Sequence, residues 1–330
     1  MSGATLLLTR RDVAELLSLD ECIPSIEEAF RLHAEGKTLS PGVLGIPAHE
    51  GGFHIKAAGL QLERTYVAVK VNGNFPRNAE RFGMPSIQGI IVLCDGENGK
   101  PLAIMDSIEI TILRTGAATA VAARHLARLD SKVATICGCG NQGRIQLKAL
   151  TKVRPIERVY CFDNSESQAR TFAADLSREL HIQVEMTREL GAAVNQSDVC
   201  VTCTPSRRPL LKREDVAPGT FIAAVGADSP EKQELDPALV VSNTIVVDIL
   251  TQCETIGELH HALEEGVITR SDVHAELGEV IAGKRPGRTS RDEIIIFDST
   301  GTALQDAAAA AIAYEKALSA ERGVRMNLFD

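Results

Sequence analysis

Tryptophan is absent from this chain of 330 residues, and aromatic side chains make up only 4% of it. Basic residues are outnumbered by acidic ones, 35 to 44, which leaves a net charge of −9. Because nucleic-acid binding depends on clustered lysines and arginines that neutralise phosphates, this composition argues against a nucleic-acid partner. A local basic pocket for a small anionic substrate remains compatible with the negative total.

Long apolar runs and ordered cysteine or histidine spacings are also missing. No stretch approaches the roughly 20 apolar residues of a membrane span, and no basic segment precedes the first apolar run, so neither a membrane helix nor a signal peptide is predicted. The eight cysteines are scattered through apolar segments, which favours a reducing, cytoplasmic setting. The Cys200–Cys203 pair lies in an expected strand with its side chains on opposite faces, and the histidines show no ligand spacing, so no metal is predicted.

The chain divides into regions of different pattern. Its length favours two domains. Residues 9–36 predict two helices, the first with a capping box at Thr9 and Asp12, and residues 38–105 predict a mostly antiparallel sheet of short strands. From residue 132 strands and helices alternate, which is typical of a parallel, doubly wound sheet. The predicted fold class is therefore α/β, a Rossmann sheet plus a second α+β domain.

A dinucleotide-binding fingerprint lies at residues 138–143, which read GCGNQG. It follows an apolar strand, opens a helix, and is followed 20 residues later by Asp163 at the end of the next strand, which is the context that the motif requires. Gly138 permits the tight turn, Gly140 allows the backbone to approach a pyrophosphate, and Gly143 allows close helix–strand packing. Asp163 would accept hydrogen bonds from ribose hydroxyls and repel a 2′-phosphate, which favours NAD over NADP as the cofactor.

Several further segments resemble the ornithine cyclodeaminase/mu-crystallin family, most closely its archaeal-type alanine dehydrogenase branch. They are VKVNGNFPRN (69–78), the segment 105–128 with ILRTGAAT, ICGCGNQG (136–143), TPSRRPLL (204–211), AVGADSPEKQELD (224–236), the segment 273–288 and IIIFDSTGTALQD (294–306). The resemblance implies a homodimer in which residues 1–118 and 305–330 form a substrate-binding and dimerisation domain, while 119–304 bind NAD. It also implies hydride transfer between nicotinamide and the α-carbon of a small amino or imino acid.

The resemblance assigns roles to individual side chains. Lys70 matches the family's active-site lysine, which contacts the substrate near its reacting carbon, and Asp228 matches its acid/base. The two are expected to act as one catalytic pair. Arg114 matches a residue that binds the substrate carboxylate, a task for which a planar guanidinium is suited. The expected cofactor contacts are Ser86, Gly138, Gly140, Asn141, Gln142, Gly143, Asp163, Thr204, Val225, Gly226, Lys232 and Ser299.

One segment departs from the family pattern. The family usually carries a second carboxylate-binding arginine on the strand before the active-site lysine, and this strand reads GGFHIKAAG. Lys56 is expected to replace that arginine as a point charge, or His54 contributes, although either residue could instead be structural. The change points to a substrate other than plain alanine, such as one with a second acid group.

Three classes of function remain open on this evidence. The first and favoured one is an NAD-dependent amino acid dehydrogenase or imino acid reductase. The second is a cyclodeaminase that regenerates its NAD within each turnover, and the third is a non-catalytic, nucleotide-linked binding protein of the mu-crystallin type. The presence of Lys70 and Asp228 argues against the third class.

Overall fold

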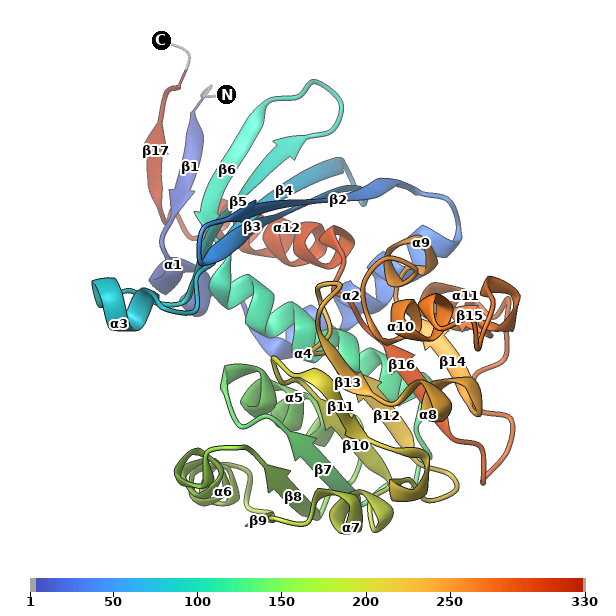
Figure 1. The fold of residues 1–330 in the computed structure, drawn as a ribbon. Helices are drawn as coiled ribbons and strands as arrows, with labels where there is room; N and C mark the ends of the chain where they lie inside the picture. The colour runs from blue at the N-terminus through green and yellow to red at the C-terminus, as the bar shows by residue number, and fades with distance from the viewer. Residues whose placement is uncertain (1–3, 329–330) are drawn as a thin grey trace. The chain divides into compact units, whose positions relative to one another are not determined.

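The computed structural model describes residues 4–328, which divide into two compact units (Figure 1). The first unit contains the residues up to Arg114 together with those from Thr302 onward, and the second runs from Thr115 to Gly301. Helix α4 (Ile108–Leu126) carries the chain from the first unit into the second. The first boundary, at residue 114, lies four residues before the expected one at 118. The second, at residue 302, lies three residues before the expected one at 305.

A mixed seven-stranded sheet forms the centre of the first unit, in the order β17-β1-β6-β5-β4-β3-β2. Its strands are β1 (Thr5–Leu8), β2 (Thr38–Ala48), β3 (Gly51–Gln61), β4 (Thr65–Asn74), β5 (Ile87–Asp95), β6 (Pro101–Asp106) and β17 (Val324–Met326). Strands β2 to β6 pair antiparallel as predicted, whereas β1 joins β6 in parallel. The register places Lys56 of β3 directly opposite Lys70 of β4, so that both side chains leave the same face of the sheet.

Helices cover that sheet through their small and apolar side chains. The helices of the unit are α1 (Arg10–Leu16), α2 (Leu19–Ala34), α3 (Asn78–Phe82) and α12 (Ala303–Ser319). Both Thr9 and Ser18 close capping boxes, with Asp12 and Glu21 respectively, which fixes the starts of α1 and α2. The alanine-rich α12 packs against α2 and against strands β3 and β4, and most of its residues are buried.

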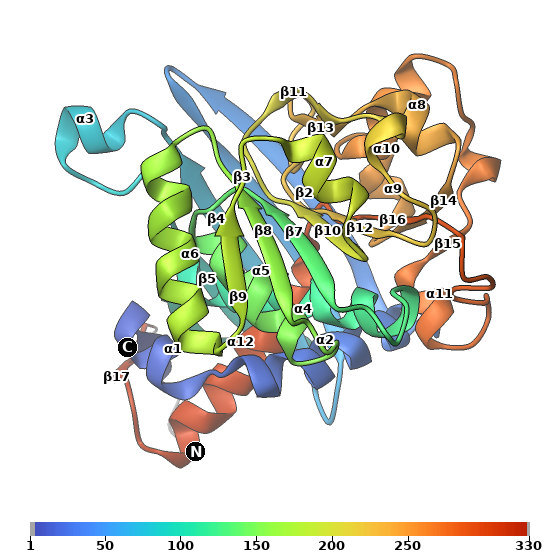
Figure 2. The same cartoon turned by 90° about the horizontal axis from the view of Figure 1, so that it is seen from below.

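A fully parallel sheet forms the second unit, in the order β15-β14-β16-β12-β10-β7-β8-β9 (Figure 2). Its strands are β7 (Val133–Cys137), β8 (Arg158–Phe162), β9 (Gln183–Met186), β10 (Val199–Thr202), β12 (Phe221–Ala224), β14 (Thr244–Val247), β15 (Ala275–Glu276) and β16 (Ile295–Asp298). The order reverses between β7 and β10, which is the switch point where doubly wound sheets bind ligands. The predicted Rossmann fold is therefore confirmed.

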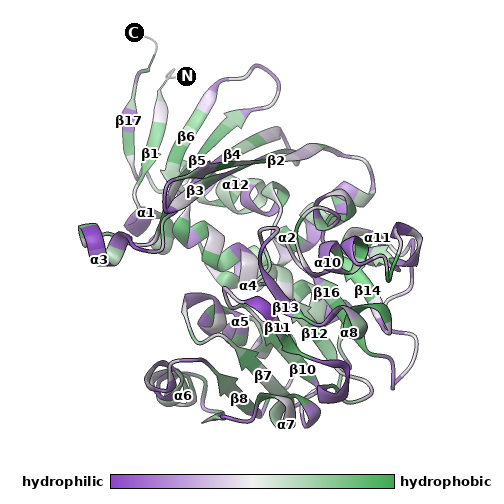
Figure 3. Ribbon diagram, viewed as in Figure 1, coloured by the Kyte–Doolittle hydropathy of each residue, from purple (hydrophilic) through white to green (hydrophobic). Residues whose placement is uncertain are grey.

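The remaining elements of this unit connect the strands and pack on them. They are α5 (Asn141–Thr151), α6 (Glu166–Leu180), α7 (Leu190–Asn195), α8 (Pro237–Val241), α9 (Leu250–Cys253), α10 (Glu258–Glu264), α11 (Leu277–Ile281) and a two-stranded pair of β11 (Arg207–Leu211) with β13 (Gln233–Leu235). Strands β7, β10 and β12 are hydrophobic along their length (Figure 3). Such runs are expected of strands that are buried on both faces.

The eight cysteines are free thiols, and six of them are buried. Cys200 lies in the middle of β10, and the Cys203 thiol donates to the carbonyl of Cys137, so this pair contributes to packing. Over residues 4–328, none of the helices combines the length and the apolar character needed to cross a membrane.

Candidate active site

The fingerprint folds into the turn that its glycines require. Gly138 adopts a φ of +101°, and its N–H donates to the carbonyl of Phe162 at 2.8 Å. A Cβ on Gly143 would lie 2.0 Å from the Gly138 carbonyl oxygen, so only glycine permits this approach of α5 to the turn. A Cβ on Gly140, in contrast, would meet only the end of Gln168 at 3.8 Å. The backbone at Gly140 is therefore open to an approaching group.

The start of α5 fits a phosphate-bearing ligand. Gly140 is the N-cap residue and supplies no capping side chain, so the first N–H groups of this 11-residue helix keep their hydrogen-bonding capacity and the positive end of the helix dipole. The Gln142 Oε1 atom is buried without a hydrogen-bond partner among residues 4–328. An anion at a helix start is bound by the free N–H groups and the helix dipole, which is how dinucleotide pyrophosphates are bound, whereas the Gln142 oxygen would need a hydrogen-bond donor such as a hydroxyl group.

Asp163 lies directly after β8, beside this turn. Its Oδ2 accepts a hydrogen bond from the Cys139 N–H and its Oδ1 accepts one from the Ser165 N–H, each at 2.9 Å. The carboxylate is thereby fixed next to the glycine turn, in the position that a ribose-binding acid requires.

Three more loops leave the carboxyl ends of neighbouring strands and carry expected site residues. Thr204 follows β10, Val225 and Gly226 follow β12, and Ser299 follows β16, where its N–H donates to the Ala224 carbonyl at 2.9 Å. Asp228 lies further along the loop after β12 and is half exposed. Its Oδ1 is 2.6 Å from Nζ of Lys232, so these two residues form an ion pair within one loop.

In the first unit, a buried cluster of charges surrounds Lys70. Its Nζ is 2.7 Å from Oδ2 of Asp306, a residue of α12. Arg114 of α4 donates from Nε to Oδ1 of the same carboxylate at 3.1 Å, and from Nη1 to Oε1 of Gln305 at 2.7 Å. Since the side chains of Lys70, Arg114 and Asp306 are at most 7% exposed, one carboxylate is shared by two buried cations.

The surroundings in this cluster shift the pKa values of Lys70 and Asp306. Burial lowers the pKa of Lys70 to about 7 despite the opposing effect of Asp306, and the nearby Arg114 and Lys56 lower it further. Burial alone would raise the pKa of Asp306, but Lys70 and Arg114 outweigh it, so that the pKa lies below its usual value. Asp306 is therefore a carboxylate over the whole range in which Lys70 gains or loses its proton.

The remaining expected substrate residues also lie in this unit. Lys56 is buried opposite Lys70, and its charge acts on both Lys70 and Asp306. His54 lies two residues earlier on β3 and is partly buried. Ser86 lies in the loop before β5, and its hydroxyl donates to the carbonyl of Pro76 at 3.3 Å, which is the turn contact that competes with a cofactor role.

Sequence reasoning did not single out Asp306 or Gln305. Both are fully buried on α12 and hold the side chain of Arg114. One signal was available, because Asp306 is the only charged residue in the apolar stretch 303–314, and a lone acid on the buried side of an alanine-rich helix requires a cation nearby. The spacing could not show which cation this is.

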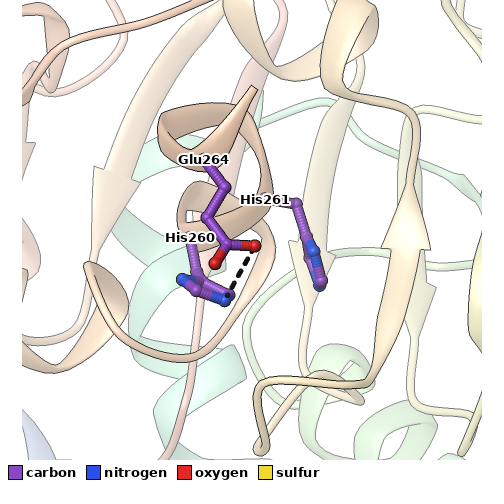
Figure 4. Close-up of side chains that lie close together, drawn as sticks. All are labelled: His260, His261 and Glu264. Atoms are coloured by element: carbon purple, nitrogen blue, oxygen red, sulfur yellow. Dashed lines mark ion pairs between the residues drawn. The ribbon is translucent and has the colours of Figure 1, made fainter. Parts of the chain in front are cut away.

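The side chains of His260, His261 and Glu264 lie close together on α10 (Figure 4). Nε2 of His260 is 3.5 Å from Oε2 of Glu264, and one ring nitrogen of His261 lies within 4.8 Å of both groups. The Nε2 atom of His261 is 2.7 Å from the carbonyl oxygen of Lys232. The sequence predicts no metal here, and the observed contact instead links His261 to the end of the loop that carries Asp228.

Comparison with known proteins shows which proteins are similar to this chain. The ornithine cyclodeaminase/mu-crystallin family matches residues 4–321. An archaeal alanine dehydrogenase dimer with bound NAD is 42% identical, with a TM-score of 0.94 over 99% of this chain and 100% of that one. The Δ1-pyrroline-2-carboxylate reductase of Thermococcus litoralis, in complex with NADH and L-proline, is 36% identical, with a TM-score of 0.92 over 98% and 100% of the two chains.

A third structure extends the range of relatives. The iminosuccinate reductase of Paracoccus denitrificans, in complex with NAD+, is 31% identical, with a TM-score of 0.90 over 98% of this chain and 100% of that one. These similarities cover both units and the whole run of motifs between residues 69 and 306. The chain belongs to the ornithine cyclodeaminase/mu-crystallin family.

Proposed function

We propose that this protein is an NAD-dependent oxidoreductase that interconverts a small L-amino acid and its 2-imino or 2-oxo acid. The observation that carries the proposal is the open start of α5, with Gly140 uncapped and Asp163 fixed beside the turn. Bound NADH would supply the hydride that reduces the imine carbon. The relatives described as complexes with NAD or NADH support the same cofactor.

The chain's own residues would prepare the substrate for that transfer. Lys70 and Arg114 carry two positive charges against the single carboxylate of Asp306, so the cluster has charge left to bind the carboxylate of an amino or imino acid. Asp228 would hold or release the proton at the imine nitrogen and would activate water for hydrolysis of the imine. Asp163 would exclude a 2′-phosphate and so favour NAD over NADP.

Within this class, a substrate with a second carboxylate has specific support. Lys56 adds a third cation to the same buried cluster, and its partner across the strand pair is Lys70 itself. A second acid group on the substrate would interact with the additional positive charge of this cluster, whereas the methyl group of alanine would not. The similarity to an iminosuccinate reductase is consistent with this choice.

A spectrophotometric screen tests both the proposed NAD-dependent activity and the proposed preference for a substrate with a second carboxylate. We expect NADH to be consumed when 2-oxo acids are supplied with ammonium, or when preformed cyclic imines are supplied, with dicarboxylic 2-oxo acids giving a higher kcat/KM than pyruvate. NADPH run in parallel should be a poorer donor. Conversion of ornithine without net change in NADH would identify a cyclodeaminase instead, and no turnover with any substrate would favour a binding protein.

We also propose that the minimal unit is a homodimer formed through the first unit. Strand β2 is a long edge strand, and the strand register puts several apolar side chains on the face of the sheet opposite Lys70, where they are between 39% and 55% exposed. This apolar face consists of Leu39, Leu44, Ile46, Phe53 and Ile90. Phe53 and Ile90, together with the exposed Phe82 and Met84, line a cavity of about 470 Å³. An unprotected edge and a contiguous apolar surface are both features of subunit interfaces.

Light scattering tests the dimer. We expect the protein to have twice the 35.4 kDa of one chain, and the double variant Leu44→Lys/Ile46→Lys to dissociate, because it would place two charges in an apolar contact. Leu129→Lys is the matched control, since Leu129 is 81% exposed but belongs to the second unit. A monomeric wild-type protein, or a double variant that remains dimeric, would contradict this interface.

The eight free cysteines fit a reducing compartment, and we propose a cytoplasmic location on that basis. Burial raises the pKa of Cys22 to about 12 and that of Cys253 well above its ordinary value. These thiols are therefore unreactive packing residues rather than redox groups.

A further inference from the structure

One buried carboxylate joins two of the loops that carry expected site residues. Glu234 is fully buried at the centre of β13. Its Oε1 accepts hydrogen bonds from the N–H and the hydroxyl of Thr204, both at 2.7 Å, and its Oε2 accepts one from the Gly226 N–H at 2.9 Å. Thr204 follows β10 and Gly226 follows β12, which are neighbouring parallel strands. The side chain therefore ties together the two loops at the carboxyl edge of the sheet.

The hydrogen bonds of the Glu234 carboxylate are constrained both at Gly226 and at the backbone of β13. A Cβ on Gly226 would lie 2.3 Å from Oε2 of Glu234, so the glycine is required for the carboxylate to approach. Behind it, Glu258 of α10 accepts hydrogen bonds from the N–H groups of Glu234 and Leu235, each at 2.9 Å. The position of the Glu234 carboxylate is therefore set by the backbone of its own strand.

The same carboxylate closes the loop 225–232, here called the Asp228 loop. Glu234 holds the amide of Gly226, the second residue of the loop, and lies two residues after the end of the loop. Inside it, Lys232 pairs with Asp228, and the Lys232 carbonyl is bonded to Nε2 of His261. Asp228 is half exposed, so the burial of its own side chain cannot fix its position. The anchors at the base of the loop fix the backbone that carries Asp228.

We propose that Glu234 is a positioning residue that holds the Asp228 loop against the Thr204 loop, so that Asp228 is aligned for proton transfer. This inference rests on the acid/base role assigned to Asp228 in the proposed function. It requires a carboxylate specifically, because three donors from two loops converge on two oxygen atoms. An amide has only one acceptor oxygen and would turn an N–H group toward one of the donors.

Glu234→Gln tests the proposal, with Glu231→Gln as the matched control on an exposed position of the same loop. If the amide oxygen stays with the two donors of Thr204, the Gly226 N–H loses its acceptor. We expect faster amide hydrogen exchange over residues 226–232 in Glu234→Gln and a fall in kcat of about 10²-fold from misplacement of the acid/base. NADH affinity should fall less than kcat does, because Gly226 and Lys232 are expected cofactor contacts in the released loop but Gly140 and Asp163 are unaffected. Glu231→Gln should behave as wild type in all three measurements.

Two results would overturn the proposal. One is wild-type exchange over 226–232 in Glu234→Gln, and the other is faster exchange with kcat unchanged. If Glu234→Gln does not fold, Gly226→Ala disturbs the same contact from the opposite side and should show the same exchange and kcat changes. If Asp228→Asn keeps its turnover, the assigned role of Asp228 fails, whereas the exchange measurement, made without substrate, still decides whether Glu234 holds the loop.

Discussion

Asp228→Asn is expected to lower turnover by roughly 10²–10⁴-fold, the range typical of removing a general acid or base. The amide keeps the shape of the side chain but can neither take up nor release a proton at neutral pH. It also replaces the ion pair with Lys232 by a weaker hydrogen bond. NADH affinity should be nearly unchanged, because the glycine turn and Asp163 belong to separate loops of the sheet edge.

The measurement combines NADH binding by fluorescence with turnover on the best substrate from the screen. Glu231→Gln removes a charge from the same loop without touching Asp228, so it controls for a general electrostatic effect. Retention of more than about a tenth of wild-type turnover by Asp228→Asn lies well outside the range for a lost acid/base and would refute the assigned role. A parallel loss of NADH affinity would instead indicate a structural collapse of the loop.

The second unit was the part of the fold that local sequence patterns predicted best. Parallel strands that are buried on both faces have continuous apolar runs, and the glycine fingerprint carries its own geometric requirement, as the 2.0 Å approach at Gly143 shows. Strand β2 lies within the region expected to form a sheet but has no strand pattern of its own, because Pro41 and Pro47 interrupt it and because its exposed apolar residues do not alternate with polar ones.

The buried cluster around Lys70 shows a second limit of prediction from sequence. The residue types and local context of Lys70 and Arg114 could be recognised from their motifs, but their common partner could not. Asp306 follows Lys70 by 236 positions in the chain, and only the packing of α12 on β4 brings the two together. Arg114 is expected to bind the substrate carboxylate, and the structure shows its guanidinium buried and held by Gln305 and Asp306 of α12. Glu234 matches no motif, because only the fold brings it together with the groups that donate to it, which are the N–H and hydroxyl of Thr204 and the N–H of Gly226.

Wild-type kcat/KM for reduction of a carboxylate substrate is expected to fall as the pH rises above about 7, approaching tenfold per pH unit. The sign follows from Lys70, whose pKa is lowered to about 7, chiefly by burial. Below this value Lys70 carries the positive charge that we propose binds the substrate carboxylate, and above it the free enzyme loses that charge. Asp306 contributes no change in this window, because its pKa lies below the ordinary value of a carboxyl group.

Lys70→Arg and Lys70→Met separate this explanation from its main competitor. Asp298 of the second unit also titrates near pH 7, because burial raises its pKa. An arginine at position 70 stays charged throughout, so the variant should lose activity overall from its different geometry but should also lose the decline above pH 7. Lys70→Met should have low kcat/KM at every pH, with kcat and substrate affinity both reduced, since the charge acts in the ground state and in the transition state. If the decline persists unchanged in Lys70→Arg, the titrating group is not Lys70, and Asp298 becomes the residue to test.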